Sequence, residues 1–344
     1  MAYTTINKSG DYFNTSLWSG NGNAQTISGV GFQPDWLWTK CRSDSYSHIL
    51  TDAVRGITKQ LKSESNAAEL TNAQGVTAFN ADGYVLGTQA DFAVNGNTFV
   101  GWGWKANGAG SANTDGAVST TVSVNTTAGF SIVKYTGTGT TTNFGHGLGV
   151  KPNVILIKSL SSNDWVMNGD FLGSTTWQHK LILNTSAAKA TANNFNDQAP
   201  TNSVFYLNSA HGTTNGSGTE YIAYCFAEKT GYSKFGSYIG NGNADGTFVY
   251  TGFKPAFILQ KDTTNANGWH LHDNKRDIDN PSNTPLYPHS SSAEGSDTLC
   301  DFLSNGFKLR TSLASRNASG STYIYMAFAE APLVGSNNVP CTAR

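Results

Sequence analysis

The strand-like stretch Trp269-His270-Leu271-His272-Asp273 is the sharpest candidate for chemistry in this sequence. Alternate residues of a strand lie on one face, so His270 and His272 could converge on one metal ion, with Asp273 or Asp277 nearby. A third ligand at a plausible spacing is missing from the sequence. We therefore predict no metal and no cofactor, and interpret the two histidines as polar residues near the end of a strand.

Carboxylates and nucleophiles are the next candidates. A glycosidase needs two carboxylates about 5–10 Å apart across a cleft. Glu228 and Glu330 both end a repeated Phe-Ala-Glu, which favours a shared structural role, such as a hydrogen bond or an ion pair with the repeated lysine. Gly216-Ser217-Gly218 is typical of a polar turn rather than a nucleophile elbow. The other carboxylates that could form a pair are Asp52, Glu64, Glu69 and Asp170. We predict that the protein is not an enzyme.

Aromatic residues are the remaining pool of functional candidates. Trp102 and Trp104 lie in a repeated strand and are expected in the core. Trp177, within the polar stretch Thr175-Thr-Trp-Gln-His179, is the better candidate for a surface contact. An exposed tryptophan suits stacking on a sugar ring or packing on a partner subunit.

These candidates must be positioned by a unit that occurs three times. The stretches 12–40, 130–158 and 232–261 each contain a short alternating run, a Gly-x-Gly turn, a proline, an apolar strand and a lysine six residues after the proline. We interpret the glycines as turn residues that need a positive φ, not as a phosphate-binding loop. The residues that define the three copies are Gly20, Pro34 and Lys40; Gly137, Pro152 and Lys158; and Gly240, Pro255 and Lys261.

The closing strand of each unit repeats as well. Residues 99–104, 221–226 and 323–328 align without gaps. The predicted division is therefore residues 1–107 and 128–229 for two units, 230–334 for the third, 108–127 for a Gly/Ser/Thr-rich linker or added edge strand, and 335–344 for a tail.

Short apolar or alternating segments between Gly, Asn and Pro predict an all-β fold. We expect three tandem antiparallel β-sandwich or jelly-roll-like units of about 100 residues, each with its own core. Only Thr51–Ala68 has a composition that suggests a helix.

Composition excludes several classes of function. The 344 residues carry a net charge of −1, and only 13% of them are charged, so a nucleic-acid binder with a basic face is not expected. No apolar run is long enough for a membrane span, and no leader peptide is apparent. The four cysteines are far apart, so we expect neither a disulfide framework nor a structural zinc site.

Longer motifs carry a family resemblance. Thr51-Asp-Ala-Val-Arg-Gly56, Gly231-Tyr-Ser-Lys-Phe-Gly-Ser-Tyr238 and Tyr323-Ile-Tyr-Met-Ala-Phe-Ala-Glu330 resemble a family of tailed-phage virion structural proteins of the marine and cyanobacterial type. The resemblance runs along the whole chain. It implies a component of the particle, made in the host cytoplasm, and no catalytic residues are associated with its motifs.

We therefore expect a non-enzymatic virion protein, an exposed tail-associated or fibre-type module that contributes to host-surface attachment. One alternative is a capsid-decorating or head-fibre protein, and another is a carbohydrate-binding or polysaccharide-degrading β-sandwich. Expected partners are other virion proteins and copies of the same chain arranged by particle symmetry, and a host-surface glycan is a further candidate.

Overall fold

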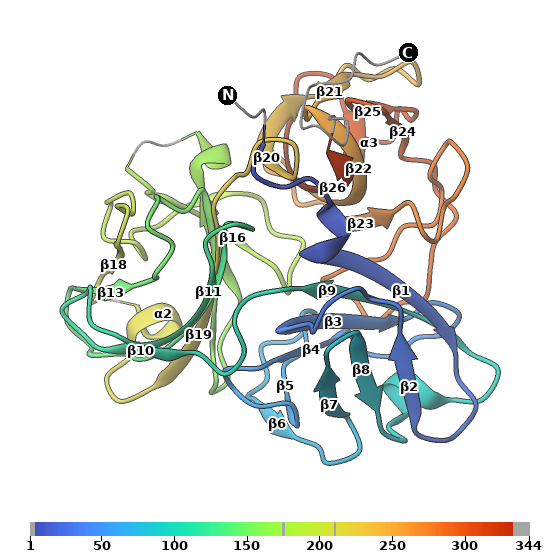
Figure 1. Cartoon of the computed structure of the whole chain (residues 1–344). Coiled ribbons are helices and arrows are strands. Elements are labelled where there is room, and N and C mark those ends of the chain that lie inside the picture. The colour runs from blue at the N-terminus through green and yellow to red at the C-terminus, as the bar shows by residue number, and fades with distance from the viewer. Residues whose placement is uncertain (1–3, 174–175, 210, 333–344) are drawn as a thin grey trace.

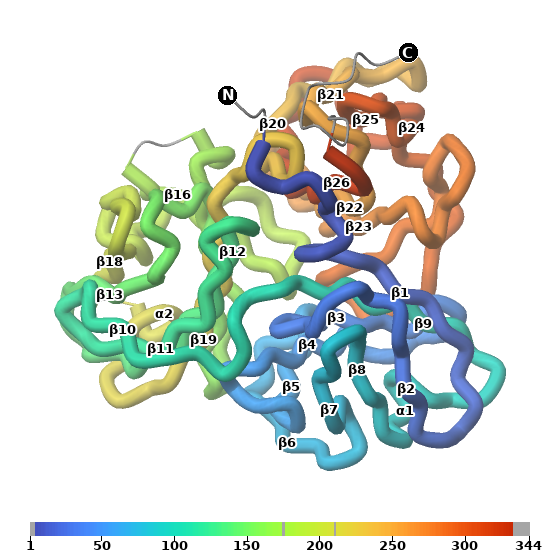
Figure 2. Tube along the Cα trace, in the orientation of Figure 1, coloured from blue at the N-terminus to red at the C-terminus, as the bar shows by residue number. Residues whose placement is uncertain are grey.

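Three lobes surround a common centre in the computed structural model, which describes residues 4–173, 176–209 and 211–332 (Figures 1 and 2). We name them segment 1 (residues 9–107), segment 2 (128–229) and segment 3 (230–332). Strands account for 42% of the chain and helices for 6%, which confirms the predicted all-β fold class.

Segment 1 contains a four-stranded and a three-stranded antiparallel sheet. Its elements are η1 (Ser9–Asp11), β1 (Phe13–Ser19), β2 (Gln25–Ser28), β3 (Trp36–Cys41), β4 (Ile49–Asp52), β5 (Lys59–Gln60), β6 (Leu70–Thr71), β7 (Val76–Asn80), β8 (Gly83–Leu86), α1 (Ala90–Ala93) and β9 (Thr98–Trp104). The larger sheet has the order β1-β9-β3-β4 and the smaller one β2-β8-β7.

Segment 2 has a wider sheet, and residues before it form one of its edges. These are β10 (Ser111–Asn113) and β11 (Thr120–Asn125), so the region 108–127 supplies edge strands rather than a free linker. The remaining elements are β12 (Phe130–Thr136), β13 (Thr142–Gly145), β14 (Val154–Ser159), β15 (Val166–Gly169), η2 (Asp170–Leu172), β16 (His179–Ile182), β17 (Ala190–Thr191), β18 (Val204–Leu207), α2 (Gly212–Asn215) and β19 (Glu220–Phe226). The sheet has the order β10-β11-β12-β19-β14-β15-β16-β17, and β13 pairs with β18.

Segment 3 again has one four-stranded and one three-stranded sheet. Its elements are β20 (Ser233–Ile239), β21 (Phe248–Tyr250), β22 (Phe253–Asp262), β23 (Trp269–Asp273), β24 (Cys300–Leu303), β25 (Gly306–Leu309), α3 (Ala314–Asn317) and β26 (Thr322–Pro332). The sheets have the orders β20-β26-β22-β23 and β21-β25-β24.

The large sheets of the three segments follow one plan. The closing strand (β9, β19 or β26) always lies between the opening strand (β1, β12 or β20) and the apolar strand (β3, β14 or β22). Every residue of β3 and of β14 is buried, because one face of each large sheet packs on its own smaller sheet and the other faces the centre of the molecule. Burial on both faces is the reason that these strands are continuous apolar runs in the sequence.

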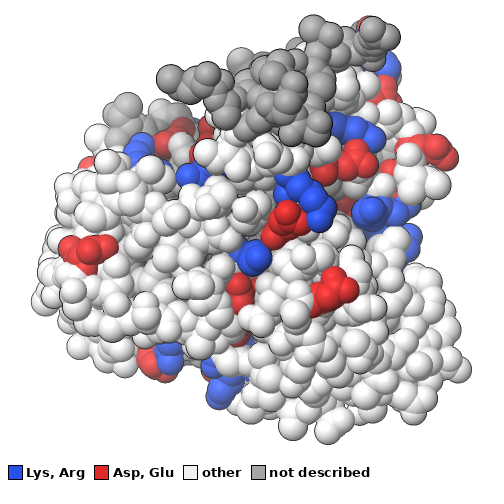
Figure 3. Space-filling view, viewed as in Figure 1, with Lys and Arg blue, Asp and Glu red and all other residues white. Residues whose placement is uncertain are grey.

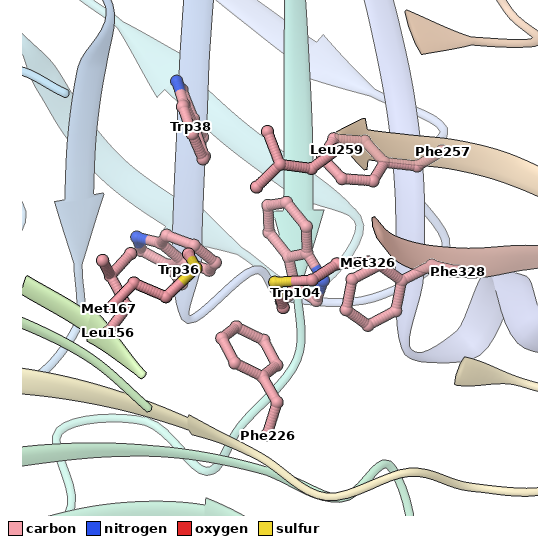
Figure 4. A pocket seen from close by; sticks show the side chains of 10 residues that line it. All are labelled: Trp36, Trp38, Trp104, Leu156, Met167, Phe226, Phe257, Leu259, Met326 and Phe328. Atoms are coloured by element: carbon pink, nitrogen blue, oxygen red, sulfur yellow. The ribbon is translucent and has the colours of Figure 1, made fainter. Parts of the chain in front are cut away.

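One core at the centre is common to all three segments. Trp36 stacks on Tyr224 with 4.4 Å between ring centroids, Phe13 on Phe328 with 5.3 Å, and Phe226 meets Phe328 at 6.0 Å. The side chains in Figure 4 enclose a cavity of only about 20 Å³, which has room for about one water molecule. Each segment also has the core of its own that the sequence predicted, but the shared centre was not expected.

The helix expected over Thr51–Ala68 is wrong. Thr51 and Asp52 end β4, and the Asp52 carboxylate then accepts the backbone N–H groups of Val54 and Arg55 at 3.0 and 2.8 Å. This side chain closes a tight turn directly after the strand, so no helix begins there. The three short α-helices instead precede the closing strands.

The Gly-x-Gly turns meet two different requirements. The second glycine of each turn has a positive φ: 77° at Gly22, 69° at Gly139 and 70° at Gly242. The first lies against a backbone carbonyl just after a short helix, where a Cβ would overlap the oxygen: Gly20 against Val94, Gly137 against Gly216 and Gly240 against Ala318. Only glycine satisfies both positions.

The repeated prolines mark where the apolar strands begin. Pro34 and Pro152 lie two residues before β3 and β14. Pro255 lies within β22, where the register with β26 shifts on both sides of it. A proline fits there because it has no N–H to donate to a ladder.

Candidate functional site

The three repeated lysines are buried structural anchors. Lys40, Lys158 and Lys261 are inaccessible to solvent, and each Nζ donates to the carbonyl of the following residue at 2.7, 2.7 and 2.5 Å. Burial lowers the pKa of all three ammonium groups to about 8. Because these groups lie out of reach of solvent, they fix the chain after the strand and offer no nucleophile to a substrate.

The expected ion pairs of these lysines with Glu228 and Glu330 are wrong. Glu228 pairs with Lys234 and Glu330 with Lys254, each at 2.7 Å. The closing strands run antiparallel to the apolar strands, so Phe226 faces Val154 and Ile222 faces Lys158. The glutamates therefore lie at the proline end of the sheet, away from the lysines.

His270 and His272 share a face of β23 as predicted, but that face is inside the molecule. His272 Nδ1 lies 2.7 Å from Ser282 Oγ, and the Ser282 hydroxyl donates to Asp277 Oδ2 at 2.6 Å. Because this hydroxyl has only one hydrogen, His272 Nδ1–H must be the donor to Ser282. Asp277, Ser282 and His272 thus form an internal hydrogen-bonded chain with the serine in the middle, which is not the order of a catalytic triad.

A buried cation lies beside this pair. Arg316 of α3 is fully buried, and its Nη2 is 3.5 Å from Asp297 Oδ2. Burial, and after it the charge of Arg316, lowers the pKa of His270 and of His272 well below 6.5. The positive charge of the Arg316 guanidinium opposes the binding of a metal cation at these two histidines. In the described part of the chain, no group of three His, Cys, Asp or Glu side chains is suited to hold a metal ion.

The candidate carboxylate Asp52 joins segment 1 to segment 2, and a second candidate, Glu69, shares its cation. Asp52 and Arg55 form a fully buried ion pair with Oδ2–Nε of 2.5 Å, and Arg55 also pairs with Glu69 at 3.2 Å. The hydroxyl of Tyr224, from β19, donates to Asp52 Oδ2 at 2.8 Å. These carboxylates hold a structural cation and do not face each other across a cleft.

Segment 3 uses the same arrangement toward segment 1. Asp273 and Arg276 pair at 2.6 Å, and Arg276 contacts Glu294 at 2.9 Å. Trp102 Nε1 of segment 1 donates to Asp273 Oδ2 at 3.1 Å, and Arg42 pairs with Glu294 at 2.7 Å. The Asp273 side chain thus points toward Trp102, on the face of β23 opposite to His270 and His272.

A third set of contacts closes the ring of segments. Trp165 Nε1 of segment 2 donates to Lys62 O of segment 1 at 2.8 Å, and Trp269 Nε1 of segment 3 donates to Ile182 O of segment 2 at 3.0 Å. His48 of segment 1 accepts the Trp38 N–H at Nδ1, so its Nε2–H donates to Tyr287 O of segment 3 at 3.1 Å. In this set each segment therefore donates a ring N–H to a backbone carbonyl of a neighbour, and the three bonds close a circle.

Glu64 and Asp170, the remaining candidate carboxylates, have separate local partners. Glu64 accepts the backbone N–H of His48 at 3.2 Å, and burial raises its pKa. Asp170 pairs with Lys151 at 2.7 Å and accepts the Trp177 indole N–H at 2.9 Å.

The prediction that Trp177 is a surface contact is wrong. Its side chain is 0% exposed and packs on Phe195 in the core of segment 2. The polar residues beside it in the sequence misled the prediction, because the ring packs on Phe195 and its indole N–H donates to Asp170. Trp102 and Trp104 are buried, as expected.

Exposed aromatic side chains occur instead on β21. Phe248 is 45% and Tyr250 59% exposed, while Val249 between them is buried. The two side chains therefore project from one face of the strand, and their Cα atoms are about 7 Å apart. Phe248 lies opposite Lys308 of β25, and Tyr250 lies opposite Gly306. We call Phe248 and Tyr250 the aromatic platform.

Polar groups border the platform on two sides. Beside Phe248, Lys308 Nζ pairs with Asp245 at 2.6 Å, and Arg310 pairs with Asp301 at 2.6 Å. Beside Tyr250 lies a surface groove of about 330 Å³, which Glu228, Ser233, Lys234 and Thr251 also line.

Sequence reasoning missed the platform. An aromatic–Val–aromatic triplet at 248–250 is the pattern of a half-buried strand, and it leaves open which face is outside. A usable signal was the departure from the other copies, which carry Thr26 and Ser28, or Asn143 and Gly145, at this point of the unit.

These features define an all-β protein whose antiparallel sheets pack around a shared core, with its described ionisable clusters engaged in structural contacts. The chain belongs to the family described as "Domain of unknown function (DUF7483)", whose model matches residues 8–332. No curated protein and no solved structure matches the chain. None of the described helices is long and apolar enough to cross a membrane.

Proposed function

We propose that this chain is a non-enzymatic structural protein of a phage particle, an exposed tail-associated or fibre-type module that contributes to attachment to the host surface. The motifs that resemble tailed-phage virion proteins support this proposal, and they extend over most of the family match.

One observation about the molecule carries the proposal: its buried charged side chains join the segments. Asp52 with Arg55, and Asp273 with Arg276, are fully buried pairs, and each accepts a hydrogen bond from another segment. Such joints suit a rigid body that displays its outer loops. On the face in Figure 3, wide areas carry no charged side chain, which suits a surface selected for contacts rather than for charged substrates.

The aromatic platform favours surface attachment over capsid decoration as the role within the particle. A decorating protein mainly needs a face toward the capsid, whereas an attachment module needs an outward-facing contact site. The platform also favours binding over degradation among the carbohydrate-related alternatives, because its bordering carboxylates are engaged with lysine and arginine side chains.

Locating the chain in purified particles tests the proposal. Labelled antibody and particle imaging should place it on the tail, at a copy number set by tail symmetry. Purified protein should also bind host cells and reduce phage adsorption. Absence from particles, or a copy number that follows the capsid lattice, would contradict the attachment role. New reducing ends released from host surface polysaccharide would contradict the non-enzymatic assignment.

A further inference from the structure

We propose that the aromatic platform, Phe248 and Tyr250, binds a neutral oligosaccharide by stacking pyranose rings on the two aromatic faces. This inference deepens the proposed attachment role and rests on it for the source of the glycan. The binding itself is argued from the platform and its surroundings.

The other two segments serve as an internal reference. By strand register, Phe248 and Tyr250 of β21 correspond to Thr26 and Ser28 of β2. The reason is that Tyr250 and Ser28 each pair with the glycine that begins the partner strand, which is Gly306 in β25 and Gly83 in β8. Segment 2 has Asn143 and Gly145 there. The fold thus forms with Thr and Ser, or with Asn and Gly, at these two positions, so the two rings of segment 3 are not needed to build the sandwich.

The geometry leaves both rings open on one side. Gly306, opposite Tyr250, has no side chain to cover the platform, and a Cβ there would lie 3.2 Å from the Phe248 ring atom Cε2. The Phe248 ring therefore lies close to the backbone of Gly306, and 45% of the residue remains exposed. The C–H-rich face of a pyranose is apolar and packs on the negative face of an aromatic ring.

Charge decides which kind of glycan fits. The ion pairs that border the platform neutralise one another: Lys308 with Asp245, Arg310 with Asp301, and Lys234 with Glu228. No charge of one sign remains in excess among them, so the complementary ligand is uncharged. This excludes a sialylated or sulfated glycan as the preferred ligand.

The same groups provide the polar contacts that a sugar needs. Paired carboxylates and ammonium groups at a surface still have free lone pairs and N–H groups for hydroxyls. The groove of about 330 Å³ beside Tyr250 extends this polar border with Ser233 and Thr251. A sugar chain can therefore stack on the platform and place its next residue in the groove.

The test uses the full chain and two substitutions taken from segment 1, Phe248→Thr and Tyr250→Ser. Neutral gluco-, galacto- and manno-oligosaccharides are titrated by saturation-transfer NMR and calorimetry, with sialylated and sulfated oligosaccharides as anionic comparators. Ile278→Ser is the control, because Ile278 is 84% exposed on another loop of segment 3. Circular dichroism verifies that each variant is folded.

We expect at least one neutral series to bind, Phe248→Thr and Tyr250→Ser each to weaken binding about tenfold through loss of one stacked ring, and Ile278→Ser to bind like the parent chain. Binding of anionic glycans only, binding unchanged in both platform variants, or no binding to any neutral series overturns the inference. Particles that carry Tyr250→Ser separate the two proposals. If they still adsorb to host cells, the attachment role stands without the platform; if the protein binds glycan but is absent from particles, only the virion role fails.

Discussion

The joint between segments 1 and 2 allows a quantitative prediction. Asp52 and Arg55 are fully buried, and Asp52 is held by two backbone N–H groups and by Tyr224 of segment 2. Arg55→Leu leaves the carboxylate buried without its cation. Removal of one partner of a buried ion pair costs about 3–5 kcal/mol of stability, and we expect the free energy of unfolding to fall by that amount.

Tyr224→Phe is a milder change at the same joint. It removes only one hydrogen bond to the charged Asp52, so we expect the free energy of unfolding to fall by about 1.5–3 kcal/mol. Tyr135→Phe is the matched control, because that buried hydroxyl donates to the neutral carbonyl of Thr214 at 2.7 Å. Tyr135→Phe should lower the free energy of unfolding by only about 0.5–1.5 kcal/mol.

Urea denaturation followed by near-UV circular dichroism measures these losses from midpoint and slope. Lys8→Ala sets the baseline, because the Lys8–Asp11 pair has side chains 72% and 46% exposed. An exposed pair of this kind contributes about 0–1 kcal/mol. The reasoning is refuted if Arg55→Leu is no more destabilising than Lys8→Ala, or if Tyr224→Phe and Tyr135→Phe lose the same free energy.

Three further outcomes follow from the structure. Because the three segments share one core, calorimetry should show a single cooperative unfolding transition, and three separate transitions would contradict the shared core. Gly240→Ala places a Cβ on the carbonyl of Ala318 and should destabilise strongly, whereas Gly10→Ala, with nothing within 4 Å of its new Cβ, should be nearly neutral in thermal melts. The lowered pKa values of His270 and His272 mean that the unfolded chain binds more protons below its own histidine pKa of about 6.5, so stability should fall as pH drops from about 6.5 toward 5. Replacing the pair by the segment 1 residues, His270→Ile with His272→Thr, should flatten that slope in melts recorded across pH.

Much of the fold could be predicted from local patterns. Short apolar runs between glycines and prolines predicted the all-β class, and the Gly-x-Gly turns lie where expected, since a left-handed residue such as Gly242 leaves a direct mark on sequence. Trp102 and Trp104 were correctly expected in the core.

The candidate site was less predictable because period-two alternation shows which residues share a face, but not what covers it. His270 and His272 do share a face, yet a second layer and Arg316 bury it. The surface prediction for Trp177 was wrong for the same reason, since its polar neighbours in sequence do not show that Phe195 packs on its ring.

The sequence by itself determined the strands, the turns and the three occurrences of one unit pattern. Only the tertiary structure decided which charged side chains are buried and which partners they meet. Asp52 meets Tyr224, and Asp273 meets Trp102, across more than a hundred residues of chain. Burial of such groups depends on how whole sheets pack around a common centre, and that packing is a property of the assembled segments rather than of any local stretch. The same packing leaves Phe248 and Tyr250 outside, although their strand pattern alone does not distinguish them from core residues.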